Sequence, residues 1–136
     1  MRKRENGVML IGDLSWRQAR HRRLLVGSDS ELAGWALDVG AKVICIECGS
    51  NNTATKLVAE GKRSYGFPAH TAANWHALND VLHDWGWVHE DRILVLFSGI
   101  SRGTKLERSL KEVCLQPLSH FYFRKPSVVF AMSTAE

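Results

Sequence analysis

The sequence predicts an α/β protein: a three-stranded parallel sheet packed with about three helices and preceded by an N-terminal extension. Two observations carry this prediction. Short apolar runs rich in β-branched residues recur after residue 41, and segments with helical periodicity separate them. Strands that alternate with helices form a parallel sheet joined by right-handed crossovers. We therefore divide the chain into an extension, residues 1–41, and an α/β domain, residues 42–136.

The composition is that of an ordinary globular protein. Of the 136 residues, 45% are hydrophobic and 24% are charged, and a chain of this size buries a core without disulfides or metal. No apolar run approaches the roughly 18–20 residues that span a bilayer. The run at residues 8–11 is too short for a signal peptide. We therefore expect a cytoplasmic protein that makes no membrane contact.

The extension contains three predicted elements, two short strands and one helix: residues 8–11, 24–26 and 31–37. Ser28 or Asp29 is the expected cap of that helix. The piece between the two strands, residues 16–23, is strongly basic.

Six elements follow, in the order strand, helix, helix, strand, helix, strand: residues 42–48, 53–62, 74–85, 92–97, 104–115 and 127–133. Each strand candidate is a short apolar run, as buried parallel strands are. Gly61 ends the first helix, Gly86 ends the second, and Pro117 stops or kinks the third. This order alone leaves several small α/β topologies open.

The helix at residues 74–85 organises the domain. Its large apolar side chains recur at spacings of three, four and three, which places them on one helical face: Trp75, Leu78, Leu82 and Trp85. The opposite face is polar and carries His76, Asn79, Asp80 and His83. We expect the first face, Trp75 included, to belong to the core and the second to form a compact polar patch.

Charge is unevenly distributed along the chain. The formal net charge of +4 and the pI near 9.2 favour nucleic acid as an alternative partner. The basic side chains that would bind it cluster early in the sequence: Arg17, Arg20, Arg22 and Arg23. Residues 64–91, by contrast, contain no Lys or Arg and carry Asp80, Asp84, Glu90 and Asp91. The organising helix is therefore acidic in a basic chain, and a solvated face is the favoured interpretation of the arginines.

Neither the cysteines nor the histidines complete a chemical motif. Cys45 and Cys48 form a C-x-x-C inside a strand candidate, which favours buried structural thiols over a redox pair. His76, Asp80 and His83, at i, i+4 and i+7, have a spacing that can gather metal ligands or acid/base groups. No H-E-x-x-H, nucleophile motif or Walker A loop accompanies them. We expect no enzyme activity, metal or cofactor, and keep the His/Asp trio as a lesser alternative.

The segment Asn-Trp-His-Ala-Leu-Asn-Asp-Val-Leu at residues 74–82 resembles the signature of the barstar family, small protein inhibitors of ribonucleases. The matching residues are Asn74, Trp75, Ala77, Leu78, Asp80 and Leu82. His76 departs from the pattern, because the family usually has an acidic residue there. The resemblance covers about residues 42–133, and three strands with three main helices is also the layout of the barstar fold.

The resemblance implies a protein partner, a toxic ribonuclease or another toxin domain, and an immunity or antitoxin role. The expected partner-binding residues are His70, Asn74, His76, Asn79, Asp80, His83 and Asp84. Among them, Asp80 takes the position of a central contact. The family also draws acidic contacts from its last helix. Around the corresponding region this chain offers His120 and Arg124 instead of acidic residues, and Glu107 or Glu112 is the alternative.

Overall fold

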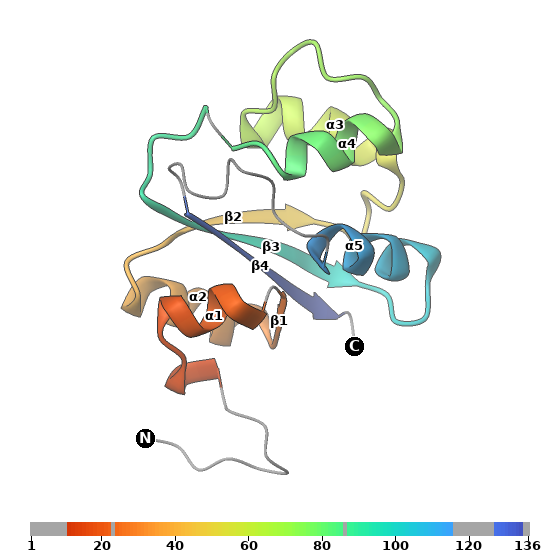
Figure 1. Cartoon of the computed structure of the whole chain (residues 1–136). Coiled ribbons are helices and arrows are strands. Elements are labelled where there is room, and N and C mark those ends of the chain that lie inside the picture. The colour runs from red at the N-terminus through yellow and green to blue at the C-terminus, as the bar shows by residue number, and fades with distance from the viewer. Residues whose placement is uncertain (1–10, 23, 86, 116–126, 135–136) are drawn as a thin grey trace.

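A computed structural model describes residues 11–22, 24–85, 87–115 and 127–134. Its sheet is parallel and contains β1 (Leu24–Val26), β2 (Lys42–Glu47), β3 (Arg92–Ile100) and β4 (Ser127–Thr134), in the order β1-β4-β3-β2 (Figure 1). The prediction of an α/β protein with a parallel sheet is confirmed. The strand number is wrong: β1, from the N-terminal extension, pairs with β4 through Leu25 and Ala131 and makes a fourth strand in the described part of the chain.

The helices cover both faces of the sheet (Figure 1). On one face lie α1 (Trp16–Arg22) and α2 (Asp29–Asp38), and on the other α3 (Ala54–Glu60), α4 (Trp75–Leu82) and α5 (Lys105–Leu115). A π-helical turn, η2 (Gly61–Tyr65), continues α3. No helix in the described ranges is long and apolar enough to cross a membrane.

The interior strands have buried side chains on both faces, because each face is covered by helices. Residues 93 to 98 of β3 are all buried, and residues 93 to 97 alternate between two cores. Ile93, Val95 and Phe97 pack toward α3, α4 and α5, and Leu94 and Leu96 pack toward α1 and α2. One strand therefore serves both cores.

The second core is built mainly from the N-terminal extension. Trp16 of α1 stacks on Trp35 of α2 with ring centroids 5.8 Å apart, and the indole N–H of Trp35 donates to the carbonyl of Leu14 at 2.8 Å. Arg92 lies over the Trp16 ring, 5.7 Å from its centroid. Residues 14–36 thus cover a sheet face that would otherwise expose Leu94, Leu96, Val129 and Ala131.

The structure refines the elements predicted in the extension. The strand at residues 24–26 and the helix after Ser28 are confirmed; Ser28 is the cap, in a reciprocal capping box with Glu31. The basic piece forms α1, a helix that had not been predicted. Of the strand expected at residues 8–11, only Ile11 lies in the described ranges, and it begins a 3-10 turn.

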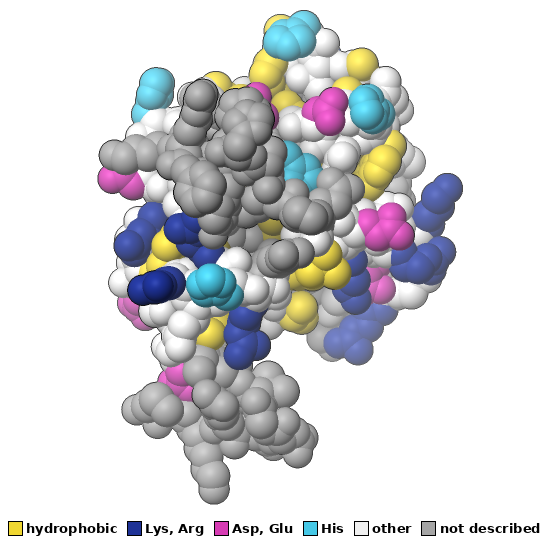
Figure 2. Space-filling view, in the orientation of Figure 1, with side chains coloured by type: hydrophobic (Ala, Val, Ile, Leu, Met, Phe, Trp, Pro, Cys, Tyr) yellow, Lys and Arg dark blue, Asp and Glu magenta, His cyan; other side chains and the backbone are white. Residues whose placement is uncertain are grey.

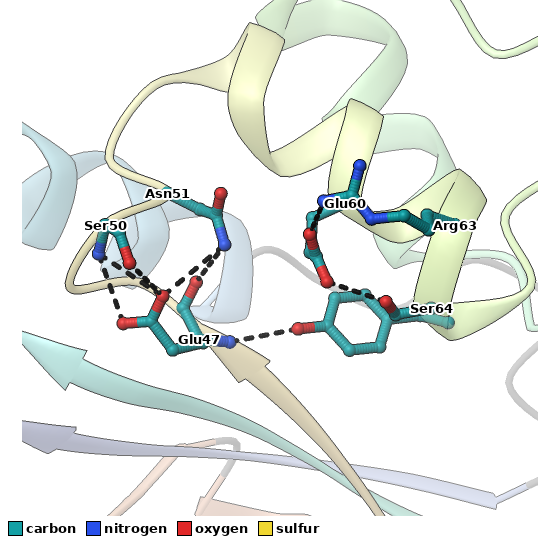
Figure 3. Close-up of polar contacts among 7 residues, drawn as sticks. Glu47, Ser50, Asn51, Glu60, Arg63 and Ser64 are labelled. Carbon is teal, nitrogen blue, oxygen red and sulfur yellow. Dashed lines mark hydrogen bonds and ion pairs between the residues drawn. The ribbon is translucent and has the colours of Figure 1, made fainter.

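β2 is an edge strand, and its carboxyl end is closed by polar contacts (Figure 3). The Glu47 carboxylate accepts hydrogen bonds from the Ser50 hydroxyl at 2.8 Å and from the Ser50 and Gly49 amides. The hydrogen bond from the Ser50 side chain is the main reason that the pKa of Glu47 lies below its usual value. The hydroxyl of Tyr65, in η2, accepts from the Glu47 amide at 3.1 Å. These bonds satisfy donors at the end of an edge strand, where backbone groups are otherwise open to pairing.

Candidate functional site

The loop that leads into α4 is anchored by Phe67. Its ring is 4% exposed and meets Trp85 and Trp87 edge-on, with centroids 6.0 and 6.3 Å away. The ring also fills the space above Gly61, since a Cβ there would lie 2.0 Å from the Phe67 ring. Glycine at position 61 therefore permits the close approach that fixes this loop against η2.

α4 is held firmly by its cap and its apolar face. Asn74 is the N-cap, and its side-chain oxygen accepts a hydrogen bond from the Ala77 amide at 2.8 Å. Leu78 and Leu82 are at most 2% exposed, as their spacing predicts. The helix ends at Leu82 with His83 as its C-cap, rather than at Gly86 as predicted, so Trp85, 3% exposed, is buried from the segment after α4. Trp75 is only half-buried, although it packs against the same core. The expectation of a core position for Trp75 therefore holds in part.

The exposed face of α4 brings His76 and Asp80 together. The His76 Nε2 lies 3.6 Å from an Asp80 carboxylate oxygen, and the two side chains are 89% and 68% exposed. A protonated imidazole would form an ion pair with that carboxylate. The pair is open to solvent and leaves room for a partner group on either side chain.

A hollow of about 360 Å³ lies between α4 and the loop before it. Asp80, Asp84 and His70 line it together with apolar groups, among them Val81, Pro68 and Trp87. Figure 2 shows histidine and acidic side chains near the top of the view, over α3 and α4, and no Lys or Arg beside them. Trp87 and Thr71 were not among the predicted site residues, although the Trp-Gly-Trp sequence at 85–87 marks an aromatic loop.

His83 faces inward to the α4–α5 contact. Its Nδ1 lies 2.8 Å from the carbonyl oxygen of Asn79, and its Nε2 lies 2.9 Å from that of Val113 in α5. The ring also meets Phe130 of β4 edge-on, at 6.0 Å. Asn79 is half-buried, and its side-chain oxygen is buried with no hydrogen-bond partner within the described ranges.

The predicted residues therefore divide into two groups. His70, His76, Asp80 and Asp84 are exposed. Asn74, which is also exposed, caps α4, His83 joins α4 to α5, and Asn79 is half-buried. The His76, Asp80 and His83 trio does not converge on one point, and the described residues contain no group of three or more His, Cys, Asp or Glu side chains placed to hold a metal ion.

Of the residues expected to contribute partner contacts from the last helix and the region around it, the structure describes only part. His120 and Arg124 lie outside the described residues. Glu107, in the first turn of α5, accepts from the Gly103 amide at 2.9 Å and lies 3.5 Å from the Lys111 ammonium group. These contacts lower the pKa of Glu107, the hydrogen bond from Gly103 most. Glu112 is exposed.

The arginine cluster occupies the opposite side of the sheet from α4. Arg17 and Arg22 are exposed on α1, whereas Arg20 is half-buried. Arg23 lies outside the described residues. The cluster is therefore separate from the α4 face.

The three cysteines are free thiols in different environments. Cys48 and Cys114 are buried, and burial raises the pKa of Cys48 to about 12. Cys45 is exposed, contrary to the expectation of a buried thiol. It lies between Ile44 and Ile46 on β2, so its side chain points to the opposite face of the strand from the one that these two residues bury. Its pKa is raised, mainly by partial desolvation and then by Asp29.

Comparisons with known proteins agree with this geometry. The family model described as "Barstar (barnase inhibitor)" matches residues 41–119, more than half of the chain. The match spans β2 to α5 and so includes α4 and the loop before it. No curated protein and no solved structure matches the chain significantly. With this match and the capped, core-anchored α4 helix, the chain belongs to the barstar family.

Proposed function

We propose that this protein binds and neutralises a toxic ribonuclease or another toxin domain, as an immunity protein or antitoxin in the cytoplasm. The observation that carries the proposal is Asp80, presented from a capped and core-anchored helix beside the hollow that it shares with Asp84 and His70. Membership of a family described as barnase inhibitors supports it. The proposed action is binding alone, without a chemical step or a cofactor.

The physical basis is charge complementarity on a rigid support. A ribonuclease binds RNA phosphate with cationic side chains, and a carboxylate that projects from a fixed helix can occupy the same place. Asp80 is 68% exposed, while the helix that carries it buries Leu78, Val81 and Leu82. A preorganised helix reduces the entropy cost of association. Long-range attraction between the acidic face and a basic partner raises the association rate.

The chain also departs from the family in a way that bears on the partner. His76 stands 3.6 Å from Asp80, where the family usually has a second acidic residue. The α4 face therefore offers less negative charge than the family pattern implies. We propose that the natural partner differs from a strongly basic ribonuclease and still binds the predicted face of α4. The exposed residues His70, His76, Asp80 and Asp84 would contact it, and Asn74, Asn79 and His83 would hold the helix that presents them.

The test is inhibition of a purified barnase-type ribonuclease, with binding followed by calorimetry. Asp80→Ala is expected to raise Kd by roughly thirtyfold or more, which corresponds to a loss of about 2 kcal/mol or more. Asp38→Ala is the matched control, because Asp38 is an exposed carboxylate on α2, across the sheet. Equal affinities for the wild type and Asp80→Ala would show that α4 is not the contact face. If the ribonuclease is not bound, the same pair of variants is compared on the toxin domain that co-purifies with the protein.

A further inference from the structure

A second hollow lies where α3, α4 and α5 begin. The strands run from left to right in Figure 1, and these three helices run back, so their first residues lie at the same end of the sheet. The hollow has a volume of about 460 Å³ and is lined from all three helices. It does not share a lining residue with the hollow beside Asp80.

Trp75 is the aromatic group of this hollow. It begins the apolar stripe of α4, yet it is half-buried, whereas Leu78, Leu82 and Trp85 are at most 3% exposed. Its indole packs on the core and lines the hollow beside Leu106 of α5. A partly exposed Trp in a concave site offers a surface on which a planar ligand can stack.

The rim of the hollow is polar and cationic. Lys105 of α5 lines it, with the amide and hydroxyl side chains of Asn52, Thr53 and Ser109, and no Asp or Glu is among its described lining residues. Three other cations of α5 and the loop before it have partners of their own and do not line the hollow: Arg102 donates to Thr134, Arg108 to the Gly103 carbonyl, and Lys111 pairs with Glu107. Figure 2 shows Lys and Arg side chains gathered on the right of the view, where α5 and that loop lie, with acidic groups between them.

Glu107, two residues after Lys105 in α5, already has a hydrogen-bond partner and an ion-pair partner. Glu107 accepts from the Gly103 amide and pairs with Lys111. Lys105, at the first position of α5, has no such carboxylate partner among the described ion pairs. A positive rim therefore adjoins an aromatic floor.

We propose that this hollow binds one nucleotide of a single-stranded nucleic acid, with the base against Trp75 and the phosphate at Lys105. An aromatic platform combined with cations that follow the backbone is how proteins bind single strands without reading their sequence. Asn52, Thr53 and Ser109 provide donors and acceptors for base or sugar edges. An acidic peptide would use Lys105 but would leave the stacking surface of Trp75 unused. This binding is separate from the inhibition of a toxin and does not depend on it.

The test is fluorescence anisotropy with a labelled ten-nucleotide oligouridylate, at low salt and at physiological salt. The affinity is expected to fall as salt rises. Trp75→Ala should weaken binding by roughly fivefold to a hundredfold, the range for losing one stacked base. Trp75→Phe keeps a smaller aromatic ring and should weaken binding less than Trp75→Ala. Circular dichroism of both variants checks that a weaker binding is not caused by loss of the fold. Lys105→Glu should weaken binding and flatten the salt dependence.

Two comparisons make the result decisive. Arg17→Glu removes a cation from α1, on the other side of the sheet, and should leave binding unchanged. Adenosine monophosphate should compete for the site; if it binds as tightly as the strand, the site takes free nucleotides by the same chemistry. No binding at low salt, a loss with Arg17→Glu but none with the Trp75 variants, or equal Trp75-dependent binding of oligoglutamate would overturn the proposal. The assay contains no protein partner, so these outcomes leave the inhibitor proposal to its own experiment.

Discussion

The Nε2 atom of His83 lies 2.9 Å from the carbonyl oxygen of Val113, and this contact joins the end of α4 to α5. The other ring nitrogen lies 2.8 Å from the Asn79 carbonyl oxygen. Both partners are carbonyl oxygens, which only accept, so the ring nitrogen that carries a proton donates to its carbonyl, and both contacts are hydrogen bonds only when both nitrogens carry one. His83 thereby fixes the helix that presents Asp80.

Replacing His83 by Ala is expected to lower the free energy of unfolding by about 1–3 kcal/mol, because a buried carbonyl loses its partner and the contact with Phe130 is lost. Urea denaturation measures this change. The control is His89→Ala, since His89 is exposed. Equal stability of His83→Ala and the wild type would show that the contact with Val113 contributes nothing.

Replacing His76 by Asp is expected to raise the association rate with a barnase-type ribonuclease several-fold at low salt, because it adds a negative charge one helical turn before Asp80. Stopped-flow fluorescence measures the rate. Ala33→Asp adds the same charge on α2 and serves as the control. The gain should shrink in high salt; a gain that is independent of salt would argue against an electrostatic cause.

Removing residues 1–41 is expected to leave a chain that aggregates or does not fold, because Leu94, Leu96, Val129 and Ala131 then lose their cover. Solubility and circular dichroism of residues 42–136 measure this outcome. A soluble, cooperatively folded fragment would instead support the predicted division at residue 41.

In the full chain, Trp35→Ala should cost about 3–5 kcal/mol of stability, and Leu37→Ala, at an 80% exposed position, should cost little.

The contacts of Glu47 predict a pH dependence. Its pKa is lower in the folded protein than the ordinary value of 4.5, chiefly because the Ser50 hydroxyl donates to it. The stability that this carboxylate adds is therefore present at neutral pH and is lost as the pH falls through the folded-state pKa, below about 4.5. Glu47→Gln should be less stable than the wild type at pH 7, and the difference should shrink at pH 3. Thermal unfolding at both pH values measures it, and a constant difference would contradict this account.

The thiols should react in two phases with a disulfide reagent at pH 8. Cys45 is exposed and should react in the native protein, although its raised pKa slows it. Cys48 and Cys114 should react only in denaturant, because both are buried and burial raises the pKa of each. Cys45→Ser should remove the fast phase. A fast phase that persists in this variant would mean that a buried thiol opens to solvent.

The sequence was most informative where apolar spacing is regular. The spacing of apolar residues between positions 75 and 85 predicted the burial of Leu78, Leu82 and Trp85. The apolar runs predicted the strands β2, β3 and β4. These predictions succeed because burial depends on periodicity within a short segment. The exposed positions of His76 and Asp80 follow from the same spacing.

The failures concern contacts between segments far apart in the chain. Nothing within the three residues of β1 indicates that they pair with residues 130–132, because strand pairing is set by the whole fold. Cys45 points to the face of the edge strand β2 that the core under α1 and α2 does not cover at this position, and the sequence of the strand does not reveal this. His83 has the spacing of a surface residue, but α5 supplies a carbonyl that turns it inward.

The pairing of β1 with β4 has a consequence for how the protein is made. Among the described strands, β1 comes first along the chain and β4 comes last, so the sheet cannot close before β4 has emerged from the ribosome. The apolar sides of α1 and α2 also pack on β3 and β4, which emerge from the ribosome long after them. Folding is therefore completed only after translation of residue 134, and until then the N-terminal helices are a natural substrate for chaperones.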